Sequence, residues 1–136
     1  MKSKISFLLA VITSLFLSYS FYVDSQGNGN LWLVPEKYQK MKNPVEVSKE
    51  SIERGKFLYS EHCKSCHGEK GLGDGPEAAQ LDTPSGDFSN KFFQTQSDGS
   101  IFYKTLEGRD DMPGFKKEIP DAKDMWSVVN YVRNLD

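Results

Sequence analysis

Both cysteines of this 136-residue chain lie in one five-residue segment, Cys63-Lys64-Ser65-Cys66-His67. Two cysteines can form at most one disulfide, so a disulfide-rich secreted scaffold is excluded. Only 39 of the 116 residues from position 21 to 136 are hydrophobic. A small domain with few core-forming residues is marginally stable by itself. The sequence therefore predicts a small domain whose core is completed by something other than its own side chains.

The C-x-x-C-H spacing of this segment is the attachment pattern for c-type haem. On a short helical segment, two thiols three residues apart can reach the two vinyl groups along one edge of a porphyrin. The adjacent His67 is then brought beneath the iron as a nitrogen ligand. We therefore expect one covalently attached haem c, bound through Cys63 and Cys66, with His67 as an axial ligand of the iron.

Three alternatives fit the segment less well. A redox-active dithiol of the thioredoxin type usually follows a strand, and no strand pattern precedes this segment. A structural zinc site needs four ligands, and the two histidines and two cysteines of residues 62–67 are too close together to close a tetrahedron easily. A single disulfide across so short a loop would stabilise the fold little.

Four side chains are candidates for a second axial ligand: Met41, His62, Met112 and Met125. Met112 stands in a polar loop directly before Pro113, which restricts the methionine to extended backbone. Met125 falls on the apolar face of an expected helix and is better explained as core. Nothing near Met41 would hold it rigid, and His62 lies on the same side of the attachment segment as His67. We therefore expect Met112 to be the ligand.

The remaining pattern is helical, with long loops. Three helix starts are indicated by their capping residues: Ser48, Ser97 or Asp98, and Asp121. The second of these helices is expected to end at Gly108. Residues 67–90 are rich in glycine, proline and polar residues, which predicts a long loop with one short helix starting at Pro76. Since no stretch alternates as a strand does, the sequence predicts an all-α domain of three to four short helices.

The amino terminus has the pattern of an export element. Lys2 and Lys4 precede an uncharged, largely apolar run over residues 5–23. At about 1.5 Å per residue, a helix of that length reaches about 28 Å, close to the hydrocarbon thickness of a bilayer. Residues 1–20 are therefore either a cleaved signal peptide or a retained membrane anchor. Both interpretations export the rest of the chain, as a soluble periplasmic protein or one anchored to the inner membrane.

An extension over residues 21–47 separates this leader from the domain at 48–136. It contains a flexible glycine–asparagine tract and two prolines, which predict little regular structure. Its aromatic residues, among them Trp32 and Tyr38, are unusual for a free linker. We therefore expect the extension to pack on the domain.

Residues 48–136 resemble a class I, mono-haem c-type cytochrome. Besides the C-x-x-C-H segment, the resemblance is carried by Gly55 and Tyr59, the glycine-rich stretch 71–76, Met112-Pro113, and Val128 and Tyr131. It implies the small cytochrome c fold, with short helices and loops wrapped around one haem. It also implies that the carbonyl of Pro76 accepts the other ring N–H of His67. Arg109 is expected either to bind a haem propionate or to be a solvated loop arginine.

The implied function is one-electron transfer in an exported electron-transport chain, not catalysis. The expected partners are redox proteins such as a membrane dehydrogenase or oxidase complex. One alternative is a cytochrome subunit of a larger membrane oxidoreductase. Another is a haem enzyme or gas sensor, which needs a labile sixth ligand. Residues 21–136 carry 15 basic and 19 acidic side chains, a balance that argues against a nucleic-acid partner.

Overall fold

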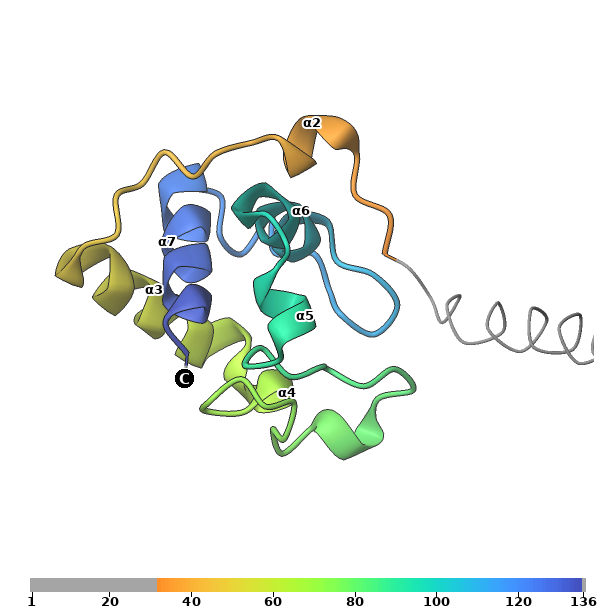
Figure 1. The fold of residues 1–136 in the computed structure, drawn as a ribbon. Coiled ribbons are helices and arrows are strands. Elements are labelled where there is room, and N and C mark those ends of the chain that lie inside the picture. Colours follow the sequence, from red (N-terminus) through yellow and green to blue (C-terminus); the bar gives the residue numbers. More distant parts are fainter. Residues whose placement is uncertain (1–31, 136) are drawn as a thin grey trace, which may run out of the picture. The chain divides into compact units, whose positions relative to one another are not determined.

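The computed structural model describes residues 32–135, and the predicted leader lies outside them. The residues from Val34 onward form one compact unit. In chain order its helices are α2 (Glu36–Gln39), α3 (Lys49–His62), α4 (Lys64–His67), the 3₁₀ helix η1 (Ala78–Gln80), α5 (Lys91–Gln94), α6 (Asp98–Glu107) and α7 (Ala122–Arg133) (Figure 1). No strand is formed within the described residues, which confirms the all-α class. None of the helices described has the length and apolar character needed to cross a membrane.

The three longer helices begin where the sequence predicts. Ser48 caps α3, because its side chain accepts a hydrogen bond from the backbone N–H of Ser51, and the side chain of Ser51 accepts one from the N–H of Ser48. Ser97 caps α6, and Asp121 caps α7 through the N–H of Lys123. These side chains satisfy N–H groups that the first helical turn leaves without a partner.

Helices α3 and α7 cross in close contact, and a glycine makes the contact possible. A Cβ atom at Gly55 would lie 2.0 Å from the carbonyl oxygen of Ser127 and 2.8 Å from Cβ of Tyr131. One turn further along α3, the rings of Tyr59 and Tyr131 pack with their centroids 5.2 Å apart. The amino-terminal end of the domain is thereby fixed against the last helix.

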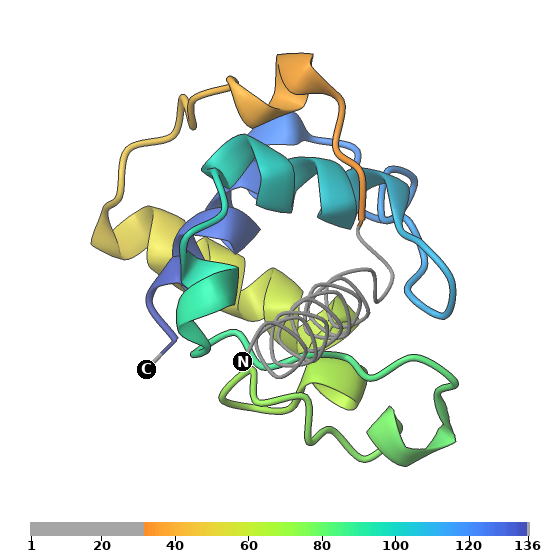
Figure 2. The same ribbon diagram turned by 45° about the vertical axis from the view of Figure 1, so that its right-hand side comes forward.

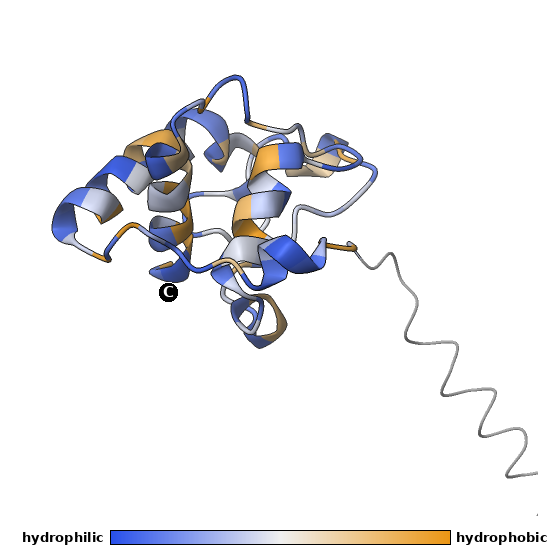
Figure 3. Ribbon diagram, turned by 90° about the horizontal axis from the view of Figure 1, so that it is seen from above, coloured by the Kyte–Doolittle hydropathy of each residue, from blue (hydrophilic) through white to orange (hydrophobic). Residues whose placement is uncertain are grey.

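The core lies on the inner face of α7. This helix buries Met125, Trp126, Val128, Val129 and Val132. Trp126 stacks on Phe102 of α6 with ring centroids 4.2 Å apart. Figure 3 shows the hydrophobic positions of the helices turned toward one another and the hydrophilic positions turned outward. The core is thus contributed mainly by α3, α6 and α7, as the spacing of apolar residues predicts.

A strap segment, residues 34–47, runs along α6 and α7 (Figures 1 and 2). Its short helix α2 was not expected from the sequence, and it contacts α6 through a Tyr38–Tyr103 ring pair at 4.7 Å. The contact is close because α6 has a glycine there: a Cβ at Gly99 would lie 2.0 Å from the carbonyl oxygen of Tyr38. The strap segment therefore packs on the domain, as expected for this part of the extension.

Candidate functional site

The C-x-x-C-H segment forms a tight helical turn at the end of α3. The backbone carbonyl of Cys63 accepts hydrogen bonds from the N–H of Cys66 at 3.2 Å and of His67 at 2.9 Å. Cys63 itself is held by a bond from its N–H to the carbonyl of Tyr59. This backbone pattern gives the two thiols and the imidazole fixed relative positions on α4.

The glycine-rich stretch that follows caps the end of α4. The N–H groups of Gly73, Gly75 and Glu77 donate to the carbonyls of His67, Cys66 and Ser65, respectively. These carbonyls lie in the last turn of a helix and need partners from outside it. A Cβ atom at Gly75 would lie 2.2 Å from the carbonyl oxygen of Ser65, so a larger residue could not make this approach. The loop therefore fixes the backbone that carries the histidine.

His67 is buried and incompletely paired. Its Nδ1 atom has no hydrogen-bond partner among residues 32–135. Its ring stacks on Phe88 with centroids 4.4 Å apart, and Phe88 stacks in turn on Phe93. Burial lowers the pKa of His67 to about 4, against a smaller opposite effect of the Ser85 backbone. The ring is thus held in a dry environment as a neutral imidazole, the form that binds a metal.

The expected hydrogen bond between His67 and the carbonyl of Pro76 stays a prediction, because Nδ1 of His67 has no partner among the described residues. Pro76 is exposed, and the backbone of Ser85 lies near enough to His67 to raise its pKa slightly against the larger effect of burial. The hydroxyl of Ser85 is also buried without a partner in the described part of the chain. Pro76 immediately follows Gly75, at the point where the capping loop leaves α4. Its place in the structure is therefore at the surface of this loop.

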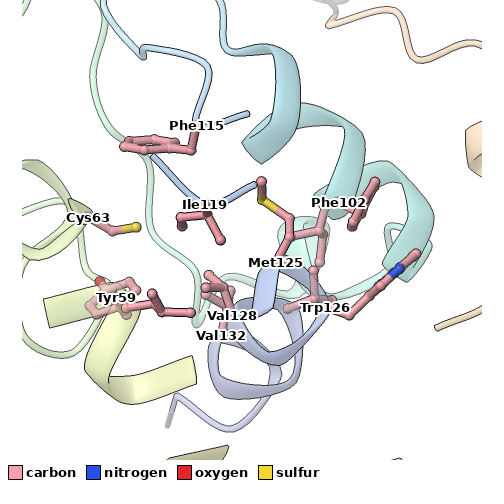
Figure 4. Packing of buried hydrophobic residues seen from close by; sticks show 12 residues of the cluster. Tyr59, Cys63, Phe102, Phe115, Ile119, Met125, Trp126, Val128 and Val132 are labelled. Carbon is pink, nitrogen blue, oxygen red and sulfur yellow. The ribbon is translucent and has the colours of Figure 1, made fainter. Parts of the chain in front are cut away.

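The two cysteines are free thiols with different surroundings. Cys63 is buried, and Figure 4 shows its sulfur pointing toward Ile119, with Phe115 and Tyr59 on either side. Burial raises the pKa of Cys63 to about 12, with a further contribution from Cys66. Cys66 is half-buried, with its sulfur 3.8 Å from a carboxylate oxygen of Glu77. One thiol thus faces the core and the other lies near the surface.

Met112 is presented by a tight hairpin turn. Arg109 and Met112 exchange two backbone hydrogen bonds, of 2.8 and 2.9 Å, around Asp110 and Asp111. Asp110 adopts the left-handed conformation that such turns require, with φ of 52°. Met112 is half-buried and packs against the cluster that includes Cys63 and Phe115. The fold therefore brings Met112 to the same core cluster as Cys63.

The other candidate residues have different places. Met125 is 1% exposed in the core, whereas Met41 is 37% exposed on the strap segment. The half-buried His62 ring packs near Phe115, with centroids 5.9 Å apart. Arg109 forms an ion pair with its neighbour Asp110, at 3.1 Å. Within residues 32–135, no three His, Cys, Asp or Glu side chains are grouped so that they could hold a metal ion alone.

Two features of the site were not predicted from the sequence. The first is the position of Ser85 beside His67, since Ser85 comes from a loop that carries no recognisable motif. The second is a hydrogen bond between that loop and the turn before Met112: the N–H of Thr83 donates to a carboxylate oxygen of Asp111 at 2.8 Å. The prolines around these residues are a local signal for rigid loops, but they do not indicate which loops meet.

The donor set fits a covalently bound haem. Two free thiols lie on a capped helical turn, and the adjacent buried imidazole has an unpartnered ring nitrogen. A thioether from a separate, well-ordered turn packs on the same core. Nitrogen and thioether ligands together are one of the sets that proteins use to hold haem iron.

Comparisons with known proteins agree with this chemistry. The cytochrome c family model matches residues 52–136. No curated protein matches the chain. Among solved structures, a chain of the reducing HAO-like protein complex of Kuenenia stuttgartiensis is similar, with 29% identity and a TM-score of 0.62. That match covers 68% of this chain but 46% of the other, so this chain spans less than half of that protein's length. Since the family model covers more than half of the sequence, the chain belongs to the cytochrome c family, which carries covalently attached haem c and transfers electrons through its iron.

Proposed function

We propose that this protein is an exported one-electron carrier whose haem is attached through Cys63 and Cys66, with His67 and Met112 as the two axial ligands. The observation that carries the proposal is the arrangement around Cys63. The buried His67 lies on the same turn, and Met112 comes from a separate loop to the same core cluster. The two ligands would thus come from segments 45 positions apart in the sequence.

Each of these residues is held in place by its backbone. The carbonyls of residues 65–67 are capped by the glycine-rich loop, which keeps the imidazole fixed. The two hydrogen bonds of the hairpin turn do the same for Met112. Bound haem supplies the one-electron iron couple. Rigid ligands on both sides lower the structural change that accompanies electron transfer, and a thioether ligand favours ferrous iron, which raises the potential.

The acceptor for the second ring N–H of His67 is part of this proposal. A histidine that ligates a metal usually donates its other N–H to a carbonyl or carboxylate, which fixes the ring. Two backbone groups are candidates for that role: the carbonyl of Pro76, at the end of the loop that caps α4, and the backbone of Ser85, which acts on the pKa of the imidazole. Arg109 pairs with Asp110 through Nε, and its guanidinium carries further N–H donors that can bind a haem propionate.

Membership in a larger assembly is the second candidate function. The similar Kuenenia chain comes from a protein complex described as reducing and HAO-like. This favours a cytochrome subunit that passes electrons within an oxidoreductase complex on the periplasmic side of a membrane. Native mass spectrometry of the protein purified from its own cells distinguishes the two: a free carrier gives the mass of one chain plus haem. The same mass shows whether residues 1–20 are retained.

Replacing Met112 tests the ligand assignment. We expect Met112→Ala to lose the weak red-edge absorption band of a sulfur-ligated ferric haem and to lower the reduction potential by roughly 0.1 V or more. Ferrous Met112→Ala should also bind carbon monoxide rapidly, because the sixth position is then open. Met41→Ala is the matched control, since Met41 lies exposed on the strap segment. An unchanged spectrum and potential in Met112→Ala would contradict the proposal. Rapid carbon monoxide binding by the unmodified protein would favour a gas-binding function.

A further inference from the structure

The loop that faces His67 also contacts the turn that carries Met112. This ligand-facing loop, residues 81–88, packs Phe88 against the imidazole ring. Two residues before Ser85, the N–H of Thr83 donates to a carboxylate oxygen of Asp111 at 2.8 Å. Asp111 is the residue directly before Met112. One loop thus touches both segments that supply the axial ligands.

The geometry leaves the Asp111 carboxylate free to make this contact. Within the hairpin turn, the backbone groups of Arg109 and Met112 pair with each other, and Asp110 takes the left-handed position. The Asp110 carboxylate pairs with Arg109. The Asp111 side chain therefore links the turn to the ligand-facing loop.

The donor of this hydrogen bond, the backbone N–H of Thr83 on the ligand-facing loop, is also held in a fixed direction. Thr83 precedes Pro84, which restricts its backbone to extended conformations. A restricted backbone holds the N–H in a nearly constant direction, so less entropy is lost when the bond forms. A carboxylate that accepts from a backbone N–H makes a charge-assisted bond, which is stronger than one between neutral groups.

We propose that Asp111 is a positioning residue: its hydrogen bond to Thr83 holds the Met112 turn against the ligand-facing loop and so keeps the thioether on the iron. We call this hydrogen bond the clasp. The inference rests on the proposed axial role of Met112. The clasp does not touch the iron itself; it limits how far the turn can move away. Loss of the clasp should therefore increase the fraction of time in which the sixth position is open.

Three variants of the haem-loaded full chain test the clasp. Asp111→Ala removes the acceptor, and Asp111→Asn keeps a neutral acceptor of the same shape. Asp82→Ala is the matched control, because Asp82 is an exposed carboxylate directly next to Thr83. The measurements are hydrogen exchange of the Thr83 amide, the carbon monoxide association rate of the ferrous form, and the red-edge ferric band.

In Asp111→Ala we expect Thr83 exchange and carbon monoxide association to accelerate by about 3- to 10-fold, the range of one hydrogen bond. Asp111→Asn should recover part of both effects, and Asp82→Ala should behave as the unmodified protein. The inference is overturned if Asp111→Ala keeps the original association rate, or if Asp82→Ala changes it equally. If instead the unmodified protein lacks the band and binds carbon monoxide as fast as Met112→Ala, the ligand assignment itself fails. Thr83 exchange still reports whether the clasp exists.

Discussion

The side-chain amide of Asn43 donates a 2.7 Å hydrogen bond to Oδ1 of Asn130, 87 positions further along the chain. Asn130 is 3% exposed, and its own Nδ2 donates to the carbonyl of Val45 at 3.2 Å and to Oγ of Ser51 at 3.3 Å. A single buried amide on α7 therefore joins the strap segment to the first turn of α3.

Asn130→Ala should detach the strap segment. The substitution leaves the Asn43 amide and the Val45 carbonyl without their partner, at a cost of about 1–3 kcal/mol in the free energy of unfolding. Urea titration of the haem-loaded protein measures this, and amide exchange should accelerate over residues 38–45. Asn134→Ala is the control, because Asn134 is the exposed residue that caps the end of the same helix, and its side chain donates to the carbonyl of Asn130. Equal stability of the two variants would contradict the role of Asn130.

Gly55→Ala should weaken the crossing of α3 and α7. The added methyl group would lie 2.0 Å from the carbonyl oxygen of Ser127, so the helices must separate. Overpacking of this kind costs about 1–3 kcal/mol. The neighbouring exposed Lys56→Ala should leave the unfolding midpoint nearly unchanged. A Gly55→Ala protein as stable as Lys56→Ala would show that the crossing can relax without cost.

The Arg54–Asp124 pair adds an acid-sensitive contribution to stability. Arg54 Nε donates to Asp124 Oδ1 at 2.8 Å, and this bond lowers the pKa of the Asp124 carboxyl. Because the folded pKa is depressed, the stabilisation is present above the unfolded value of about 3.9 and is lost as the pH falls through the folded value. The stability difference between the unmodified protein and Asp124→Asn should therefore be greatest near pH 7 and shrink below about pH 4. A difference that does not change with pH would contradict this contribution, which solvent exposure keeps small.

Haem attachment should be required for folding. A Cys63→Ala, Cys66→Ala double variant cannot form the thioether bonds, and the few apolar residues of the chain then lack the large group around which they pack. We expect its far-ultraviolet circular dichroism to show most of the helix lost, whereas the haem-loaded protein unfolds cooperatively on heating. A well-folded double variant that contains no haem would disprove this dependence.

The helix boundaries could be predicted because their signals are local. Ser48, Ser97 and Asp121 bond to N–H groups two or three residues away, so the sequence shows both partners together. The short helices α2 and α5 were missed for the opposite reason. Each has four residues and no buried residue of its own, and each packs on distant parts of the chain.

By itself, the sequence determined the attachment segment and the capped helices, and it singled out Met112. Each of these follows from residue types within a few positions of one another. Only the tertiary structure decided that Ser85 lies beside His67, that Asp111 reaches Thr83, and that Asn130 holds the strap segment. These pairs join positions 18 to 87 residues apart, and packing and loop closure select them. No local spacing encodes that selection, since many exposed polar side chains compete for the same few buried partners.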